Sequence, residues 1–217
     1  VPLPDGLDGQ RAMAIGTAGF TAMLCVMTLE EAGITPDKGT VLVTGAAGGV
    51  GSVATAILAN LGYKVAAVSG RPESEQYLRQ LGAAEFVTRE EMNKPPRALE
   101  RQRWAGAIDT VGSTLLARVL AEMDYSGCVA ACGLAGGADL PTTVMPFILR
   151  NVSLRGVDSV MCPVDRRKAA WSRLVRDLPA DALGEIGQTV SLEDLPDAAE
   201  KIIAGQIRGR VIVDLSR

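Results

Sequence analysis

The chain has 217 residues, of which 47% are hydrophobic and 22% are charged, so it can form a packed core and does not have the composition of a disordered protein. A formal net charge of −3 provides no overall basic field, which argues against nucleic acid as a partner. Histidine is absent, which excludes Ser–His and Cys–His nucleophile pairs, histidine zinc sites and a histidine general base within this chain.

The four cysteines are predicted to be free thiols in a reducing compartment. Cys128 and Cys132 are four positions apart in an apolar run, which is not the spacing of a zinc knuckle or a redox pair. We identify no apolar run of the ~18–20 residues that cross a bilayer, and no signal-peptide pattern at the beginning of the chain. We therefore expect a cytoplasmic protein that binds neither a metal nor a membrane.

Strands and helices are predicted to alternate through most of the chain, which indicates βαβ crossovers and a parallel sheet. A linker over Val1–Gln10 and a helical turn precede an apolar helix over Thr21–Ala32. The predicted strands are Thr40–Thr44, Lys64–Ser69, Glu85–Val87, Trp104–Asp109, Gly127–Cys132 and Ser153–Val157. The predicted helices among them are Val50–Leu61, Glu73–Leu81 and Thr114–Met123, with a loop containing some helix over Met92–Gln102.

The last part of the chain has a different organisation. A predicted helix over Arg166–Arg176 is followed by a β-α-β unit, made of Ile186–Leu192, Pro196–Ala204 and Gly209–Leu215. The predicted fold is therefore α/β: a Rossmann-type, doubly wound parallel six-stranded sheet, followed by a C-terminal β-α-β segment.

A glycine-rich turn, Gly45-Ala46-Ala47-Gly48-Gly49-Val50-Gly51, joins the first strand to the following helix. This context places free backbone N–H groups and the positive end of a helix at one point, which suits a diphosphate. The next strand follows after about twenty residues, as in dinucleotide-binding units. The alternative is a turn whose glycines serve packing only.

The end of the second strand indicates which nucleotide binds. An NAD site has Asp or Glu at this position, to accept from the adenosine ribose hydroxyls. This strand instead ends in Ser69, Gly70 and Arg71, and Glu73 and Glu75 come only later. A hydroxyl, a flexible glycine and a guanidinium suit a 2′-phosphate through charge-assisted hydrogen bonds. The residues favour NADPH over NADH, and the alternative is that Arg71 is an ordinary surface charge.

Further motifs extend over nearly the whole chain. They are IGTAGFTAMLCVM (15–27), VTGAAGGVGS (43–52), AVSGR (67–71), WAGAIDTVG (104–112), GCVAACGLAGG (127–137), LPTTVMPFILRNVSLRGVDSV (140–160) and GQIRGRVIVDL (205–215). With these motifs the chain resembles the medium-chain dehydrogenase/reductase superfamily, in its zinc-free quinone-oxidoreductase branch. Within that branch it is most similar to the NADPH-dependent acrylyl-CoA reductases.

The resemblance implies three groups of cofactor-binding residues. The pyrophosphate would be lined by Ala47, Gly48, Gly49 and Val50. The 2′-phosphate and the adenosine would be contacted by Ser69, Gly70, Arg71 and Arg89. The nicotinamide would be approached by Leu134, Ile148 and Ser159. From the residues alone, Pro146–Ile148 would be interpreted as core, and Asp109 as readily as a helix N-cap as a site residue.

The resemblance also implies that a GroES-like domain, with which family members begin and which holds most of their substrate pocket, has no counterpart here. We therefore expect a C-terminal portion of a longer enzyme, inactive alone, whose catalytic residues lie outside this chain. The expected division is a linker over 1–10, an NADPH-binding domain over 11–158, and a C-terminal segment of the catalytic domain over 159–217.

The implied reaction is NADPH-dependent reduction of an activated carbon–carbon double bond, most closely that of acrylyl-CoA to propionyl-CoA. The alternatives are an NADPH-dependent quinone or enone oxidoreductase and a non-catalytic NADPH-binding module. Zinc-free relatives pair their nucleotide-binding domains edge to edge, so the resemblance further implies a homodimer through the predicted edge strand Ser153–Val157.

Overall fold

A six-stranded, all-parallel sheet organises residues 2–215, which are the residues that the computed structural model describes. Its strand order is β3-β2-β1-β4-β5-β6. The strands are β1 (Thr40–Val43), β2 (Lys64–Ser69), β3 (Glu85–Thr88), β4 (Trp104–Asp109), β5 (Met123–Ala131) and β6 (Ser153–Gly156). The order reverses between β1 and β4, as in Rossmann folds, so the predicted fold class is confirmed.

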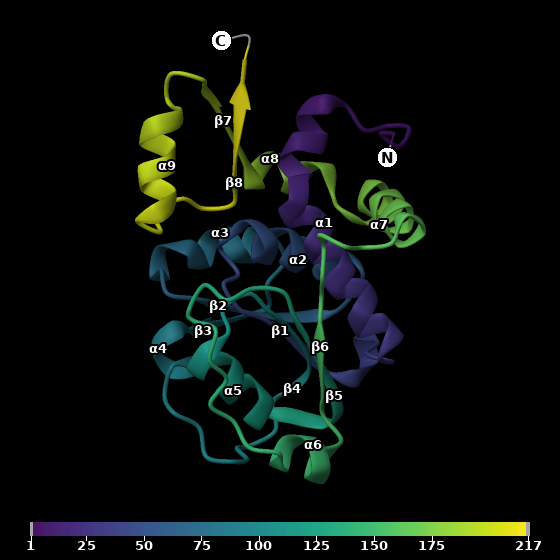
Figure 1. The fold of residues 1–217 in the computed structure, drawn as a ribbon, viewed down its shortest axis with the longest axis vertical. Coiled ribbons are helices and arrows are strands. Elements are labelled where there is room, and N and C mark those ends of the chain that lie inside the picture. Colours follow the sequence, from purple (N-terminus) through teal and green to yellow (C-terminus); the bar gives the residue numbers. More distant parts are fainter. Residues whose placement is uncertain (1, 216–217) are drawn as a thin grey trace.

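Helices cover both faces of the sheet, as Figure 1 shows. One face packs against α1 (Gly9–Glu31), α2 (Gly49–Asn60), α3 (Glu75–Gln80), α7 (Val164–Asp177) and α8 (Ala180–Ile186). The other face packs against α4 (Arg89–Met92), α5 (Ser113–Ala121) and α6 (Met145–Arg150). Strand side chains alternate between the two cores, with Val41 and Val43 in the first and Leu42 in the second.

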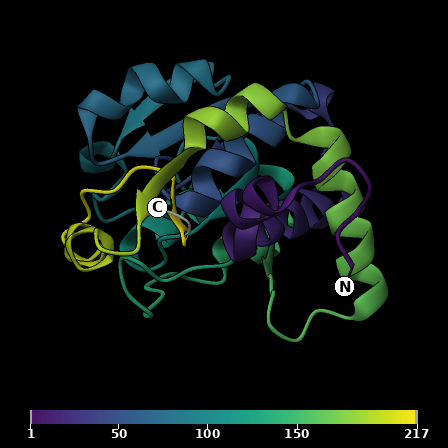
Figure 2. The same ribbon diagram turned by 90° about the horizontal axis from the view of Figure 1, so that it is seen from above.

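A smaller unit stands at the C-terminal end of the molecule, made of β7 (Gly187–Ser191), α9 (Leu195–Ile203) and β8 (Arg210–Asp214). Its two strands pair in parallel, with Gly187 opposite Arg210, so the predicted β-α-β unit is confirmed. From above, α9 and α7 lie at opposite sides of the molecule (Figure 2). The predicted domain boundary after residue 158 stays a prediction, and α7 and α8 beyond it pack into the core of the sheet.

Helix α1 corrects two expectations. It is a helix of 23 residues with a kink at Gly16, whereas the predicted helix began at Thr21. The hydroxyls of Thr21 and Thr28 donate to carbonyls one turn back, at 2.8 Å each, so these polar residues do not interrupt it. Its length and mean hydropathy of 1.8 also qualify it as a candidate membrane span, and 67% of that stretch is buried inside the fold. In this fold it is a core helix.

Other differences concern short elements. The predicted helix Glu73–Leu81 is divided into a 3₁₀ turn, Pro72–Ser74, and α3, and another 3₁₀ turn lies at Pro36–Lys38. Helices α6 and α8 were not predicted, because six or seven residues carry too little periodicity to be recognised. Strand β5 begins four residues earlier than predicted, and the register shifts between its pairs Trp104–Met123 and Gly106–Cys128.

Candidate functional site

A cavity of about 550 Å³ lies at the carboxyl ends of the central strands, at the point where the strand order reverses. In open parallel sheets this edge is where ligands bind. Among the described residues that line the cavity, two are arginines and none is a carboxylate. The lining residues are Gly45, Ala47, Gly48, Ser69, Gly70, Arg71, Arg89, Asn93, Thr110, Val111, Leu115, Ala135, Gly136, Ala204, Gly205 and Ile207.

The glycine-rich turn has a geometry that excludes side chains. Gly45 has φ +58°, and a Cβ on it would lie 2.3 Å from Thr110 Oγ1. A Cβ on Gly51 would lie 2.4 Å from the carbonyl oxygen of Gly45. Helix α2 begins directly after Gly48, whose position as N-cap supplies no side chain to the first N–H groups of the helix. Those N–H groups and the helix dipole have the chemistry that suits an anion at the cavity.

Asp109 ties the glycine-rich turn to the loop after β4. Its buried carboxylate accepts hydrogen bonds from the Thr44 hydroxyl at 2.7 Å and the Gly112 N–H at 2.8 Å. Burial raises the pKa of Asp109, and the hydrogen bonds from Thr44 and Gly112 oppose that rise. The N-cap of α5 is Gly112, so Asp109 is not the cap residue that the sequence allowed. Its role is to hold the two loops together.

Two guanidinium groups face the cavity from either side of Gly70. Arg71 donates from both terminal nitrogens to the carbonyl oxygen of Ile207, at 3.2 Å each, and its backbone N–H donates to Ser69 Oγ at 3.1 Å. A Cβ on Gly70 would lie 2.7 Å from Arg89 Cζ, so the Arg89 guanidinium rests on this glycine. Within residues 2–215 neither arginine forms an ion pair. Their positive charge is therefore available to an anionic ligand.

A loop from the C-terminal unit, residues 204–209, closes one side of the cavity and was not predicted. The Gly209 N–H donates to the carbonyl oxygen of Ala47 at 3.0 Å, directly on the glycine-rich turn. Next to it, Arg210 lies against that turn, since a Cβ on Gly49 would be 2.9 Å from Arg210 Cδ. Burial lowers the pKa of Arg210. The motif containing these residues was noticed in the sequence, but only the fold brings it to the turn.

Comparison with known proteins gives the family. A family model described as zinc-binding dehydrogenase matches residues 49–176, which is more than half of the chain. The chain belongs to this dehydrogenase family. Its membership of the medium-chain dehydrogenase/reductase superfamily, predicted from the motifs, is thereby confirmed.

Several dehydrogenases of this family are similar over the whole chain. Probable acrylyl-CoA reductase AcuI of Escherichia coli is 59% identical over 216 residues, which are 100% of this chain and 66% of that protein. The yhdH oxidoreductase from Salmonella enterica, solved in complex with NADP, is 60% identical, with a TM-score of 0.97 over 99% of this chain and 66% of its own. Bacillus subtilis yhfP, solved with NAD bound and named a putative quinone oxidoreductase, is 51% identical, with a TM-score of 0.95 over the same shares.

The remaining predicted site residues lie outside the cavity lining. Gly49 and Val50 form the first turn of α2, at the edge of the cavity. Leu134 directly precedes the lining residue Ala135, and its side chain is 67% exposed. Ile148 on α6 is 71% exposed, and the carbonyl of Ser159 accepts a hydrogen bond from Arg167 at 3.0 Å. None of the three predicted nicotinamide residues is therefore among the lining residues, and their role stays a prediction.

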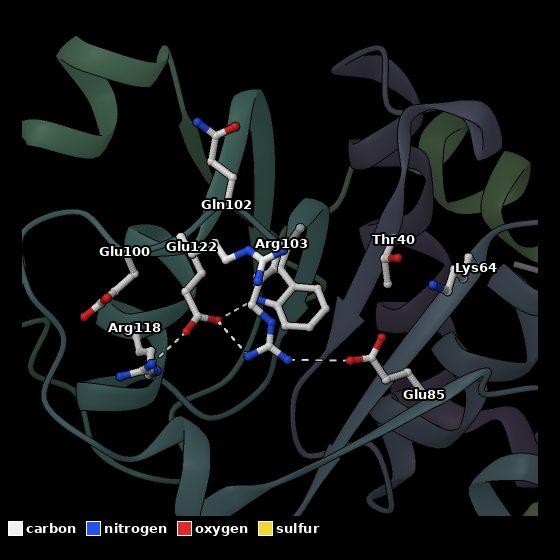
Figure 3. A pocket seen from close by; sticks show the side chains of 10 residues that line it. Thr40, Lys64, Glu85, Glu100, Gln102, Arg103, Arg118 and Glu122 are labelled. Atoms are coloured by element: carbon white, nitrogen blue, oxygen red, sulfur yellow. Dashed lines mark hydrogen bonds and ion pairs between the residues drawn. The ribbon is translucent and has the colours of Figure 1, made fainter.

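A second cavity, of about 600 Å³, lies at the opposite edge of the sheet, where Thr40, Lys64 and Glu85 begin their strands (Figure 3). Its charges are largely paired with one another. Glu122 is 2.9 Å from Arg118 and accepts from Trp104 Nε1 at 2.9 Å, and Arg103 lies between Glu122 and Glu85. The carboxylates of this second cavity are paired, and the cavity lies far from the glycine-rich turn. The candidate site is therefore the first cavity, at the carboxyl edge of the sheet.

The described part of the chain contains no group of three Cys, Asp or Glu side chains arranged to hold a metal ion. Cys132 follows β5, and its N–H donates to the carbonyl oxygen of Asp109 at 2.9 Å. A hydrogen bond between the two thiols, in which Cys25 is the donor, lowers the pKa of the Cys132 thiol and raises that of Cys25. All four cysteines are free thiols, as predicted.

Proposed function

We propose that the cavity at the carboxyl ends of β1, β2 and β4 binds NADPH. The observation that carries the proposal is the end of β2, where Arg71 and Arg89 flank Gly70 without a carboxylate. An NAD-specific site has an acidic residue there for the ribose hydroxyls, whereas a 2′-phosphate requires cations. We assign the pyrophosphate to Ala47, Gly48, Gly49 and Val50, and the 2′-phosphate and adenosine to Ser69, Gly70, Arg71 and Arg89.

Solved relatives contain different nucleotides, so the preference for NADPH over NADH needs a direct test. The Salmonella enterica relative holds NADP, which supports the proposal, whereas the Bacillus subtilis relative was solved with NAD. The half-buried Arg210 adds a cation beside the pyrophosphate position, where it would strengthen binding of either nucleotide. The nicotinamide contacts of Leu134, Ile148 and Ser159 stay predictions.

For the whole protein we propose NADPH-dependent reduction of acrylyl-CoA to propionyl-CoA. When bound, NADPH supplies the hydride for the β-carbon of the double bond, and a proton is added at the α-carbon. The residues of this chain hold and orient the nucleotide, and we place the catalytic residues outside it. The support is the 59% identity to a probable acrylyl-CoA reductase. The chain spans 66% of that protein, so the activity belongs to the whole protein.

A quinone or enone reductase is the second candidate, because the Bacillus subtilis relative carries the name putative quinone oxidoreductase. The test is steady-state kinetics of the full natural protein with NADPH and either acrylyl-CoA or a simple quinone. A larger kcat/KM for acrylyl-CoA supports the first candidate, and a larger value for the quinone supports the second. Nucleotide binding without turnover of either would indicate a binding module. Residues 1–217 alone are expected to show no steady turnover.

We further propose that two copies pair through β6. This strand is at the edge of the sheet, and its unpaired backbone groups suit another β6. Exposed apolar side chains gather in the flanking segments, at Val144, Ile148, Leu149, Val160 and Met161. Light scattering that gives twice the chain mass supports the pairing, and a monomer at micromolar concentration argues against it.

The remaining expectations concern zinc and the location of the protein. We infer that this part of the protein works without zinc, since the chain has no histidine and its described cysteines are not clustered with acids. Elemental analysis that finds stoichiometric zinc in the purified chain would contradict this inference. A cytoplasmic location stays a prediction.

A further inference from the structure

The 204–209 loop holds the side chain of Arg71. Both terminal nitrogens of Arg71 donate to one acceptor, the carbonyl oxygen of Ile207, at 3.2 Å each, across 136 positions of sequence. A guanidinium has five N–H donors in a rigid plane, so two bonds to a single oxygen define the orientation of the plane. Three N–H groups remain for a ligand in the cavity that both residues line.

The loop itself is fixed at two points. The Gly209 N–H donates to the Ala47 carbonyl at 3.0 Å, and the Arg208 guanidinium lies 4.1 Å from the centre of the buried Tyr77 ring. Gly209 has φ +64°, and a Cβ there would lie 2.3 Å from the carbonyl oxygen of Ile186. The chain therefore passes this point in one arrangement, and the Ile207 carbonyl has a defined position.

An arginine side chain that is free in solution must lose much rotamer freedom before it can hold a phosphate. The contact with Ile207 removes part of this freedom in advance, and preorganisation of this kind increases affinity. The carbonyl cannot contact a nucleotide anion favourably itself, because both carry negative charge at oxygen. Its effect on a phosphate must therefore pass through Arg71.

We propose that the 204–209 loop is a selectivity element, in which the carbonyl of Ile207 positions Arg71 for the 2′-phosphate of NADPH. This inference rests on the proposed function, because it requires that Arg71 contacts that phosphate. Ile207 is a positioning residue, and the loop distinguishes NADPH from NADH without contacting the group that differs between them.

A double-mutant cycle tests this coupling. Deletion of Gln206 shortens the loop and moves the Ile207 carbonyl away from Arg71. The deletion is made both in the parent protein and in the Arg71→Ala variant, which gives four proteins. Fluorescence titration with NADPH and with NADH then gives eight dissociation constants. We expect the deletion to raise the Kd of NADPH about tenfold, which is the effect of losing about one hydrogen bond to a charged group. The Kd of NADH should change by less than about twofold. In Arg71→Ala the deletion should cause no further loss of NADPH.

Three results would overturn the inference. Equal weakening of both nucleotides would mean that the loop only supports the cavity. The same loss in the Arg71→Ala background would show that the loop acts independently of Arg71. Tighter binding of NADPH after the deletion would mean that Ile207 competes with the phosphate for Arg71. The matched control is Ile203→Ala, on the neighbouring helix α9, whose side chain is 87% exposed; it should change neither constant.

A second variant covers failure of the deletion protein to fold. Replacing the peptide bond between Ile207 and Arg208 by an ester, through semisynthesis of the C-terminal segment, weakens that carbonyl as an acceptor and keeps every side chain. It should reduce only NADPH affinity, and an unchanged NADPH constant would overturn the inference. If the preference for NADPH depends on Arg71 but does not change when the loop is altered, this inference alone is refuted. A parent protein without any preference for NADPH refutes the proposed function.

Discussion

The hydroxyl of Thr44 donates a hydrogen bond of 2.7 Å to the carboxylate of Asp109, although 65 positions separate the two residues. Both side chains are fully buried at the carboxyl ends of the neighbouring strands β1 and β4. Because the other carboxylate oxygen accepts from the Gly112 N–H, one side chain joins the two loops that border the cavity. The shape of the cavity therefore depends on a residue that does not line it.

Replacing Asp109 by Ala should lower the free energy of unfolding by about 2 kcal/mol, since two hydrogen bonds to a charged acceptor are lost while the cost of burying the charge is relieved. Binding of NADPH and NADH should weaken to the same extent, because Asp109 shapes the cavity without recognising either nucleotide. Urea denaturation and nucleotide titration measure both effects. Asp139→Ala, at an exposed loop position, is the matched control and should change neither. Unchanged stability of Asp109→Ala would contradict the role assigned to this carboxylate.

Gly51→Ala should disrupt the glycine-rich turn. The new Cβ would lie 2.4 Å from the Gly45 carbonyl oxygen and 2.6 Å from Ala46 Cα, so the turn and α2 must separate. We expect a loss of about 2–3 kcal/mol of stability, typical of an overpacked site, together with weaker binding of both nucleotides.

The matched control for that substitution is Gly184→Ala in α8, where a Cβ meets nothing within 4 Å. It should stabilise the protein by about 0.5–1 kcal/mol, because alanine loses less backbone entropy than glycine in a helix. Thermal unfolding monitored by circular dichroism compares the two variants. Equal effects of both substitutions would mean that the turn tolerates a side chain.

Part of this architecture is predictable from local signals. The bounds of β2 and β4 agree with the predicted ranges, because each strand is a short apolar run ended by a Gly or a loop. The glycine-rich turn and Ser69-Gly70-Arg71 were predicted from their position at strand ends. Gly45, Ala47 and Gly48 of the turn line the same cavity as Ser69-Gly70-Arg71.

The position of the 204–209 loop cannot be predicted from the local sequence. Its contacts to Arg71 and Ala47 join residues more than a hundred positions apart, and the type of residue in the loop does not indicate them. The continuity of α1 was missed for another reason, since Gly16 has a non-helical conformation yet the chain continues as helix on both sides. Tertiary packing against α2 and β5 stabilises it there.

Acid should weaken an ion pair at the opposite edge of the sheet. Hydrogen bonds from the side chain and then the backbone N–H of Arg97 hold the pKa of Glu100 at about 2, below its ordinary 4.5. A lowered pKa means that the stabilisation is complete above the unfolded-state value and is lost as the pH falls through about 2. The difference in unfolding free energy between the parent protein and Arg97→Ala should therefore shrink between about pH 5 and pH 2.

Urea denaturation across this pH range measures that difference, and an NMR titration of Glu100 in both proteins gives its pKa directly. Arg101→Ala, at an exposed neighbouring position, is the control and should leave the pKa of Glu100 unchanged. A constant difference between the parent protein and Arg97→Ala over the whole range would refute the pairing. Nucleotide affinity should not follow this titration, because the pair lies away from the glycine-rich turn.

Recognition of the 2′-phosphate by Arg71 is the central claim, and titration of the parent protein and Arg71→Ala with NADPH and NADH tests it most directly. Arg71 and Arg89 both line the cavity, beside Gly70. Neither guanidinium has an ion-pair partner in the described chain. We predict that NADPH binding weakens by about 2 kcal/mol, roughly thirtyfold in Kd, while NADH changes by less than about twofold. Equal losses of affinity for the two nucleotides, which would leave the preference for NADPH unchanged, would contradict recognition of the 2′-phosphate by Arg71.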